Sequence, residues 1–509
     1  MFKIFLVAFF FGAISGFSMA PFNYTILLFV TFPLMIHFLD IIYNYSYKKF
    51  IKSFFLFFFF GIGFYVISIF WLITPFSYNE VVNIWLVPLI VFFLILFLSI
   101  FNGLAGLCSM YFWNKGFFRI LIFSSFWIFF EIVRSYVLTG FPWNLISYTW
   151  SWNEEIMQVT SFIGSYGLSF FTVLGCASLI YFKQFKKYLN LFPVFLIFTF
   201  YIFGYFFLQN KSNSFSEEIF VQIIQPNIPQ HIKNNVANQN TTISKLFLLS
   251  SDSSFGASDS LQDKKVLIIW PETAITSILD SQQKKNVEHF SSFLKENQLL
   301  ITGIPRLENN QFFNSLIVVD HQRRILANYD KYHLVPFGEY IPLASFFSFV
   351  GIEKYFDKFS QFSSGNNRSN ISLKGIPSFR SLICYEVIFP WEIISKNDTR
   401  PSFIINITND AWFGDISGPY QHLVASRFRS VEFGLPILRS ANTGISAIID
   451  PYGRLINFVK LNETGVMSSP LPKATGRTFY SKFGDYPLFV FLFIILFFGF
   501  FSRNNYHNR

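Results

Sequence analysis

The sequence predicts a chain with two kinds of domain, a multi-pass α-helical membrane domain and an α/β domain outside the membrane. Of the 509 residues, 52% are hydrophobic and 13% are charged, whereas an ordinary soluble protein has about 25% charged residues. Eight apolar runs approach or reach the roughly 20 residues that cross a bilayer. Between the seventh and eighth runs, short β-rich stretches alternate with longer mixed segments, a pattern typical of a layered α/β or α+β domain.

The apolar runs set the expected domain boundaries. We expect a membrane domain of seven helices over residues 1–208, an extracytoplasmic domain over 209–486, and a C-terminal transmembrane helix with a short cytoplasmic tail over 487–509. The helices are expected at roughly 4–20, 24–42, 53–73, 84–107, 117–138, 159–181, 191–208 and 487–502. The first run also has features of a cleavable signal peptide, but another apolar run follows at once, which favours a retained helix.

Positive charge is concentrated in alternate loops between these helices. If both termini are cytoplasmic, the short loops that carry most of the Lys and Arg all lie on the cytoplasmic side, as the positive-inside rule requires. These residues are Lys3, Lys48, Lys49, Lys52, Lys115, Arg119, Lys183, Lys186, Lys187, Arg503 and Arg509. The polar region between the seventh and eighth helices then lies outside the cytoplasmic membrane.

The net charge of +10 does not indicate a nucleic-acid partner. Residues 1–208 and 487–509 contain 12 Lys and Arg against 5 Asp and Glu, so most of the positive excess accompanies apolar segments rather than a basic stripe. The apolar content excludes intrinsic disorder. The three cysteines are scattered, which predicts neither a disulfide framework nor a metal site and leaves Cys384 as an isolated thiol.

Few ionisable residues lie within the apolar runs. Glu131 and Arg134 are three residues apart near the end of the fifth run, hence on one helical face, and Asp40 lies in the second. A structural ion pair is the favoured interpretation of Glu131 and Arg134, and a place beside a polar lipid headgroup is the alternative. So small a set argues against a transporter with an extracytoplasmic domain.

The polar region is expected to fold into alternating strands and helices. Strands are expected at 219–224, 265–270, 298–303, 314–319, 323–328, 379–384, 402–407, 436–440, 445–450 and 454–459. Helices are expected at 239–250, 281–297, 386–396 and 419–434. Three patterns just beyond predicted strands carry candidate chemistry, because functional groups are commonly placed on such loops.

The first two patterns supply a carboxylate and an ammonium. Glu272 follows an apolar strand; half-buried there, its proton affinity would be raised as a general base requires, although it could instead cap a helix. Lys331 and Glu339 lie in a loop that two prolines and a glycine make irregular. A fixed ammonium can stabilise an oxyanion and lower the pKa of a nearby thiol. His333 in the same loop is expected to be structural rather than catalytic.

The third pattern is a strand that reaches Cys384, with a helix expected just after it. Such a turn would expose the sulfur and aim backbone N–H groups and a helix dipole at it. The same N–H groups could hold a tetrahedral oxyanion. Alone the pattern fits a buried, inert cysteine; with the other two patterns it predicts a nucleophile.

The order Glu272, Lys331, Cys384, with these flanking residues, resembles the nitrilase superfamily, whose members are αββα sandwiches with a Glu-Lys-Cys triad. The membrane segments narrow the resemblance to the membrane-bound apolipoprotein N-acyltransferases. Supporting stretches are 16–22, 131–134, 140–143, 225–230, 409–414, 418–422 and 439–444. The resemblance covers nearly the full chain and implies a nitrilase-like αββα sandwich on the periplasmic side of a bacterial inner membrane.

The resemblance implies acyl transfer without a cofactor or metal. Glu272 would be the general base, Lys331 the oxyanion partner and Cys384 the nucleophile. The acyl chain would pass from a membrane phospholipid, through a thioester, to the α-amino group of the diacylglyceryl-cysteine of an apolipoprotein. Supporting residues would be Glu339, Tyr385, Glu386, Trp412 and Trp143, the last in an aromatic belt or against an acyl chain.

Two positions depart from the family pattern. Asn234 and Tyr420 stand where tryptophan is expected, which puts fine substrate contacts in doubt rather than the reaction. The aromatic stretch within 341–356 fits either a lid that touches acyl chains or a plain core segment. The competing function is a membrane-anchored amidase or nitrilase that hydrolyses a small C–N substrate with the same triad and water as acceptor.

Overall fold

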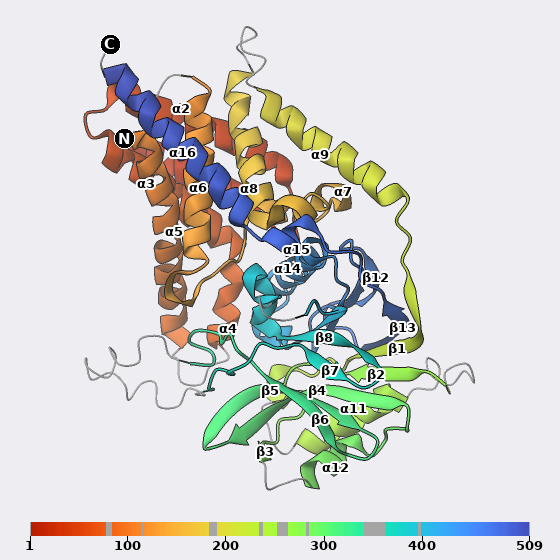
Figure 1. Cartoon of the computed structure of the whole chain (residues 1–509). Helices are drawn as coiled ribbons and strands as arrows, with labels where there is room; N and C mark the ends of the chain where they lie inside the picture. Colours follow the sequence, from red (N-terminus) through yellow and green to blue (C-terminus); the bar gives the residue numbers. More distant parts are fainter. Residues whose placement is uncertain are drawn as a thin grey trace. The chain divides into compact units, whose positions relative to one another are not determined.

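The computed structural model describes residues 2–77, 84–113, 116–182, 191–233, 238–251, 263–280, 285–340, 362–394 and 399–507. The chain divides into two compact units, each described here by itself (Figure 1). The helical unit comprises Met1–Ser77, Val82–Lys211 and Arg477–Arg509. The sandwich unit comprises the long segment Ser212–Gly476.

The helical unit contains a helix at each of the eight segments predicted to be apolar spans. Its α-helices are α1 (Phe2–Gly16), α2 (Leu28–Tyr45), α3 (Lys49–Ser68), α4 (Ile73–Ser77), α5 (Val87–Tyr111), α6 (Phe118–Arg134), α7 (Glu154–Met157), α8 (Thr160–Ser178), α9 (Phe192–Gln209), α15 (Phe479–Phe483) and α16 (Tyr486–His507). Among the described residues, five helical stretches are long and apolar enough to cross a membrane: Thr25–Tyr45, Lys49–Ser68, Val87–Tyr111, Thr160–Tyr181 and Phe192–Gln209. With 15 and 17 residues, α1 and α6 are shorter. The predicted membrane helical domain is confirmed.

Helices α1 and α3 cross with their backbones in close contact. A Cβ atom at Gly12 would lie 1.9 Å from the Phe60 carbonyl oxygen, and one at Gly63 would lie 1.9 Å from the Phe9 carbonyl oxygen. Small residues allow such an approach between membrane helices, where packing replaces the hydrophobic effect. The first apolar run thus forms a helix that packs closely on α3.

The charged residues within the helical unit have structural contacts. Arg134 donates to the Trp143 carbonyl oxygen at 3.0 Å, and its Nη2 lies 4.0 Å from Glu131 Oε1. The same Glu131 oxygen accepts from the backbone N–H of Ile146 at 3.1 Å. These contacts join the end of α6 to the chain that follows it, which agrees with the structural interpretation of the pair.

The sandwich unit is built from two β-sheets. The first has the order β13-β1-β2-β4-β5-β6, with β3 paired to β4, and the second the order β12-β11-β10-β9-β8-β7. The strands are β1 (Phe215–Gln225), β2 (Lys265–Ile269), β3 (Leu279–Asp280), β4 (Gln298–Glu308), β5 (Gln311–Asp320), β6 (Ile325–Asp330), β7 (Ile371–Leu373), β8 (Ile376–Ile383), β9 (Phe403–Thr408), β10 (Ile437–Ala441), β11 (Ser446–Ile449), β12 (Leu455–Val459) and β13 (Gly465–Pro472). The helices are α10 (Gln230–Lys233), α11 (Gln239–Ser251), α12 (Lys285–Ser291) and α14 (Gly418–Phe433).

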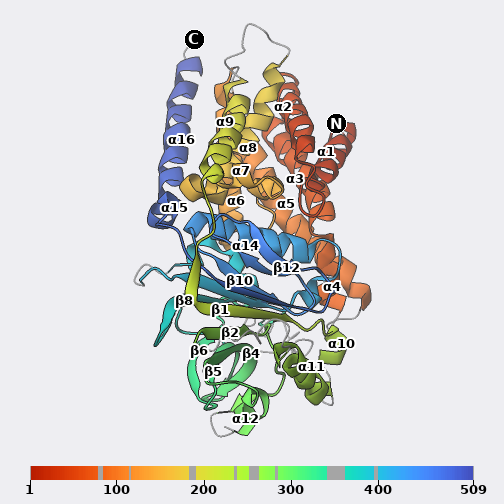
Figure 2. The ribbon, with the colours of Figure 1, turned by 90° about the vertical axis from the view of Figure 1, so that its right-hand side faces the viewer.

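The sheets and helices form four layers. Figure 2 shows α14 over the second sheet and α11 and α12 over the first, with the two sheets facing each other. One apolar core lies between the sheets and includes Val221, Leu267, Phe403 and Leu438. The predicted αββα sandwich is confirmed.

Several sequence-based expectations for the sandwich unit need correction. The strands β3 and β7 were not expected, and the helix expected at 281–297 ends at Ser291. No strand was expected after residue 459; β13, which contains Pro470 and Pro472, pairs antiparallel with β1 at the edge of its sheet, where missing N–H donors are tolerated. The helix expected at 386–396 is replaced by two 3₁₀ turns, Cys384–Ile388 and Pro390–Glu392. Phe389 before Pro390 is extended, with φ −94° and ψ 100°, because a residue that precedes proline avoids the α region.

The α1–α3 crossing gives a prediction for the helical unit. Gly63→Ala forces α1 and α3 apart and should destabilise the protein by about 1–3 kcal/mol, the usual cost of overpacking. The measurement is the unfolding temperature of the purified full chain in detergent. Ile14→Ala, which trims an exposed side chain of α1, is the control and should leave that temperature nearly unchanged. An equal effect of the two substitutions would contradict the tight crossing.

Candidate active site

The predicted triad lies where several strands of the sandwich unit end. Glu272 follows β2 and Cys384 follows β8, both parallel strands of their sheets. Strand β6 runs in the same direction as β4, because β5 is antiparallel to both, and Lys331 follows β6 directly. The topology therefore brings residues far apart in sequence to one edge of the sandwich, as is usual for α/β sites.

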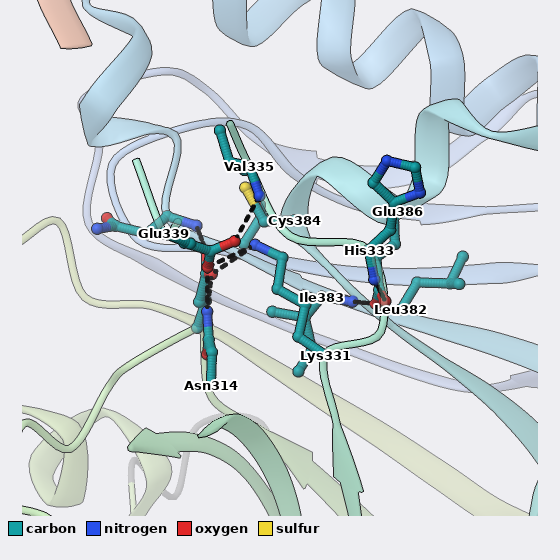
Figure 3. Close-up of polar contacts among 12 residues, drawn as sticks. Asn314, Lys331, His333, Val335, Glu339, Leu382, Ile383, Cys384 and Glu386 are labelled. Atoms are coloured by element: carbon teal, nitrogen blue, oxygen red, sulfur yellow. Dashed lines mark hydrogen bonds and ion pairs between the residues drawn. The ribbon is translucent and has the colours of Figure 1, made fainter. Parts of the chain in front are cut away.

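Lys331 occupies the centre of a buried polar cluster. Its Nζ donates to Glu339 Oε1 at 2.8 Å and lies 3.6 Å from Glu272 Oε1. Asn314 Nδ2 donates to both carboxylates, at 2.8 Å to Glu272 and 2.9 Å to Glu339. Figure 3 shows Asn314, Lys331, Glu339 and Cys384 gathered around one point. Only 1% of Lys331 is exposed.

Two carboxylates keep this buried lysine charged. Burial alone would lower the pKa of Lys331, but the negative charges of Glu339 and Glu272 raise it above its ordinary value. Lys331 therefore remains an ammonium at neutral pH and can act only as a donor and a positive charge. That property suits an oxyanion partner and excludes a general base.

The Glu272 carboxylate is fixed from several sides. Its Oε2 accepts from the backbone N–H of Asn409 at 2.9 Å, and its Oε1 faces Asn314 and Lys331. On the backbone, its carbonyl oxygen accepts from Lys233 Nζ at 2.9 Å. Glu272 is buried and does not cap a helix; all its partners are donors, as an acceptor-only carboxylate requires.

Cys384 lies in a strained turn at the end of β8. Its φ is +52°, a left-handed conformation that non-glycine residues rarely adopt and that tends to cluster at functional sites. The sulfur was expected to be exposed at the start of an α-helix, but Cys384 is 5% exposed and begins the 3₁₀ turn Cys384–Ile388. A 3₁₀ turn thus takes the place of the α-helix whose dipole was expected to act on the sulfur.

Burial dominates the acidity of the Cys384 thiol. It raises the pKa of that thiol, the Glu272 carboxylate raises it further, and the Lys331 ammonium lowers it without reversing the shift. The expected effect of Lys331 on the thiol is present but too small to preform a thiolate at neutral pH. A base must accept the proton as the sulfur attacks, and Glu272 is the nearby carboxylate that raises this pKa.

Glu386 holds the turn that carries Cys384. Its carboxylate accepts from the backbone N–H groups of Ile383, Tyr332 and His333 at 2.7, 2.8 and 3.1 Å, and from the Tyr329 hydroxyl at 2.8 Å. Four donors, from β6, the loop that follows it and the end of β8, therefore converge on one side chain. Glu386 ties the loop of Lys331 to the turn of the cysteine, as the contacts at the right of Figure 3 show.

The remaining sequence-predicted residues have varied surroundings. His333 stacks on Phe389 at 3.7 Å between ring centroids and bonds Glu392 at 3.0 Å, so its contacts are structural. Tyr385 is buried against Phe389, with ring centroids 5.1 Å apart. Trp143 is 3% exposed in the helical unit, packed on Trp71, so it does not face lipid as an aromatic-belt residue would. His333 and Tyr385 belong to the sandwich unit and Trp143 to the helical unit.

Other expectations for substrate contacts stay predictions. Trp412 lies in the 3₁₀ turn Asp410–Phe413 after β9 and is partly buried. Tyr420 is in the first turn of α14, also partly buried. Asn234 and the stretch 341–356 lie outside the described residues.

Comparison with known proteins places these units in families. Residues 223–479 match the carbon-nitrogen hydrolase family model, and residues 11–178 match the model of the apolipoprotein N-acyltransferase N-terminal domain. An apolipoprotein N-acyltransferase of Bradyrhizobium diazoefficiens is 35% identical over 95% of this chain and 92% of that protein. One of Brucella melitensis is 34% identical, over 92% and 89% respectively.

The chain belongs to the apolipoprotein N-acyltransferase family. The full-length match to these relatives supports an acyltransferase and not the alternative amidase. A solved Saccharomyces cerevisiae member of the nitrilase superfamily is 17% identical, with a TM-score of 0.38, and covers 54% of this chain and 98% of its own. Membership in the family makes this chain a membrane acyltransferase.

Sequence reasoning did not single out several residues that contact the triad, among them Asn314 and Lys233. Asn314 is a polar residue on an inward position of β5, buried among apolar neighbours, and bonds two carboxylates. Lys233 is buried, and burial lowers its pKa to about 8 against the opposing effect of Glu272. The sequence signal for Asn314 was an amide side chain within an apolar strand. For Lys233 the only signal was the nearby stretch 225–230.

The raised pKa of Cys384 gives a prediction about its reactivity. Only the thiolate is alkylated, so a raised pKa means that the rate should rise about tenfold per pH unit from pH 7 to 9 and reach no plateau in that range. The measurement is iodoacetamide modification of the Cys384 peptide, followed by mass spectrometry in the full chain. A plateau near pH 7 would show a preformed thiolate and contradict the burial argument.

Proposed function

We propose that the chain is a phospholipid:apolipoprotein N-acyltransferase that carries the acyl group as a thioester on Cys384. The observation that supports this most is the charged Lys331 beside Glu272, at the strand-end edge that also bears Cys384. A positively charged donor, a carboxylate base and a neutral thiol are the parts that acyl transfer needs.

The first half of the reaction forms the thioester. Glu272 accepts the Sγ proton as the sulfur attacks the ester carbonyl of a membrane phospholipid. The oxyanion of the tetrahedral intermediate accepts a hydrogen bond from Lys331. When the intermediate collapses, the C–O bond breaks, protonated Glu272 returns its proton to the leaving oxygen, and a lysophospholipid departs.

The second half transfers the acyl group to an amine. The neutral α-amino group of a diacylglyceryl-cysteine attacks the thioester carbonyl, Lys331 again holds the oxyanion, and Glu272 takes a proton from the nitrogen. The C–S bond then breaks, the sulfur regains a proton, and an N-acylated apolipoprotein leaves. Donor and acceptor bind in turn at one sulfur, which is ping-pong catalysis.

Glu339 and Asn314 support the reaction through Lys331. Glu339 Oε2 accepts from the backbone N–H of Val335 at 2.8 Å, and its Oε1 accepts from both Lys331 and Asn314. These contacts fix the ammonium so that little reorganisation is needed when the oxyanion forms. Tyr385, Trp412 and Trp143 are proposed substrate-binding residues.

The charge distribution supports a location for the catalytic unit. We place it on the periplasmic side of the bacterial inner membrane, with both termini in the cytoplasm, because Lys and Arg then flank the helices on the cytoplasmic side. Both substrates are anchored in lipid, so a catalytic unit tethered by membrane helices meets them without leaving the bilayer surface.

The nucleophile assignment predicts the fate of labelled phospholipid. Wild-type enzyme incubated with phospholipid carrying an alkyne-tagged acyl chain should form a hydroxylamine-sensitive adduct on the Cys384 peptide. Cys384→Ala should lose at least 99% of it, because the acceptor sulfur is gone. Cys108→Ala, at a half-buried position of α5, is the matched control and should retain the adduct.

Addition of a diacylated lipopeptide then distinguishes transfer from hydrolysis. The label should move to the lipopeptide as an amide that hydroxylamine does not cleave. Release of free fatty acid without a labelled lipopeptide would contradict acyl transfer and favour the hydrolase.

The proposed topology predicts which positions an impermeant maleimide can reach in intact cells. Gln311→Cys, at the exposed start of β5, should be labelled once the outer membrane is permeabilised. Lys48→Cys, exposed just before α3, should be labelled only after the cells are lysed. The unsubstituted protein gives the background from its three native cysteines, and the reverse pattern would overturn the orientation.

A further inference from the structure

Three stretches that carried the family resemblance meet in a buried network behind Cys384. They contribute Asp410, His422 and Arg439, each with 0% exposure. Asp410 Oδ2 accepts from Arg439 Nη2 at 2.6 Å, and Asp410 Oδ1 lies 2.9 Å from His422 Nδ1. None of these side chains has a role in the acyl-transfer steps described above.

The network reaches the nucleophile through its backbone. His422 Nε2 lies 3.1 Å from the carbonyl oxygen of Cys384. A carbonyl oxygen can only accept, so Nε2 carries the proton in this contact, whichever state Nδ1 is in. Burial and the Arg439 charge lower the pKa of His422, whereas the Asp410 charge raises it, and the Nε2–H donor is present in both the neutral and the charged ring.

Cys384 needs such a contact because of its conformation. A φ of +52° is disfavoured for a cysteine and persists only where the surroundings hold it. On the amino side, Glu386 binds the N–H of Ile383 at 2.7 Å. On the carboxyl side, His422 binds the carbonyl of Cys384 itself. The two contacts fix the backbone just before the nucleophile, at the Leu382–Ile383 peptide, and just after it, at its own carbonyl.

The network is itself held rigidly. Thr408 Oγ1 donates to Asp410 Oδ1 at 2.9 Å, and Arg439 Nη1 donates to Asn406 Oδ1. A Cβ atom at Gly444 would lie 2.3 Å from Asp410 Oδ2, so the loop after β10 passes directly over this carboxylate. The Asp410 carboxylate is fixed by these partners and in turn orients the His422 ring. A hydrogen-bonded carboxylate orients a metal-binding histidine in the same way.

We propose that His422, oriented by Asp410 and Arg439, is a positioning residue that holds the backbone of Cys384 in the conformation required for attack on the acyl donor. This proposal depends on the proposed function, because that function supplies the reaction in which Cys384 attacks. It explains why residues from 409–414, 418–422 and 439–444 come together although none of the three stretches contains a member of the triad.

Two substitutions separate the contact with Cys384 from the contact with Asp410. The amide nitrogen of Gln can reach the place of His Nε2 and keep a donor for the Cys384 carbonyl. The shorter Asn reaches only the place of Nδ1. We expect His422→Gln to keep kcat for thioester formation within about threefold of wild type and His422→Asn to lower it at least tenfold, with KM for phospholipid unchanged in both.

Folding and function are checked in the same proteins. Ser430→Ala, two turns later on α14, removes a buried hydroxyl that donates to the Leu435 carbonyl oxygen at 2.8 Å and serves as the matched control, with wild-type rates expected. The unfolding temperature of each full-length variant in detergent reports stability. If His422→Asn unfolds, His422→Gln still tests the proposal, because a folded His422→Gln that loses the rate while Ser430→Ala keeps it would overturn the proposal.

Iodoacetamide modification of Cys384 gives a second measure that needs no phospholipid. It should slow in His422→Asn and stay near wild type in His422→Gln. A wild-type enzyme that is alkylated but forms no thioester would contradict the proposed function. The comparison of alkylation rates between His422→Gln and His422→Asn would still test the role of His422. Equal loss of rate in His422→Gln and His422→Asn, or wild-type rates in both, would overturn the proposal.

Discussion

The candidate site depends on one buried positive charge. Lys331 is almost fully removed from water, and its charge is stable only because two carboxylates lie beside it. Removing a partner from a buried pair typically costs about 3–5 kcal/mol, so the partners of Lys331 are constrained as strongly as the lysine itself. The result is an ammonium that needs no rearrangement when negative charge develops nearby.

The sandwich topology explains how the charge cluster is assembled. Glu272, Lys331 and Cys384 each follow a strand that ends at the same edge, so the direction of the strands sets their proximity. The apolar core between the sheets fixes the strands, and the strand ends carry the polar groups. Few of the residues in the cluster lie close in sequence, which is why their meeting depends on the whole unit.

Most regular elements and a candidate triad could be read from the sequence because their signals are local. Apolar runs of four or more residues identified the buried parallel strands, and the order Glu272, Lys331, Cys384 identified the family. The contacts of Asn314 and His422 could not be predicted, because a single polar residue in a strand or helix does not say which distant group it faces. No strand was expected at β13; its two prolines fit an edge strand, and only the sheet order shows that β13 lies at an edge.

The neutrality of the Cys384 sulfur has a consequence beyond the reaction. Oxidants such as hydrogen peroxide attack the thiolate and reach exposed sulfur first. A thiol that is 5% exposed and held protonated between turnovers is a poor target for sulfenic acid formation. The burial that raises the pKa of the Cys384 thiol thus also protects its sulfur from oxidation.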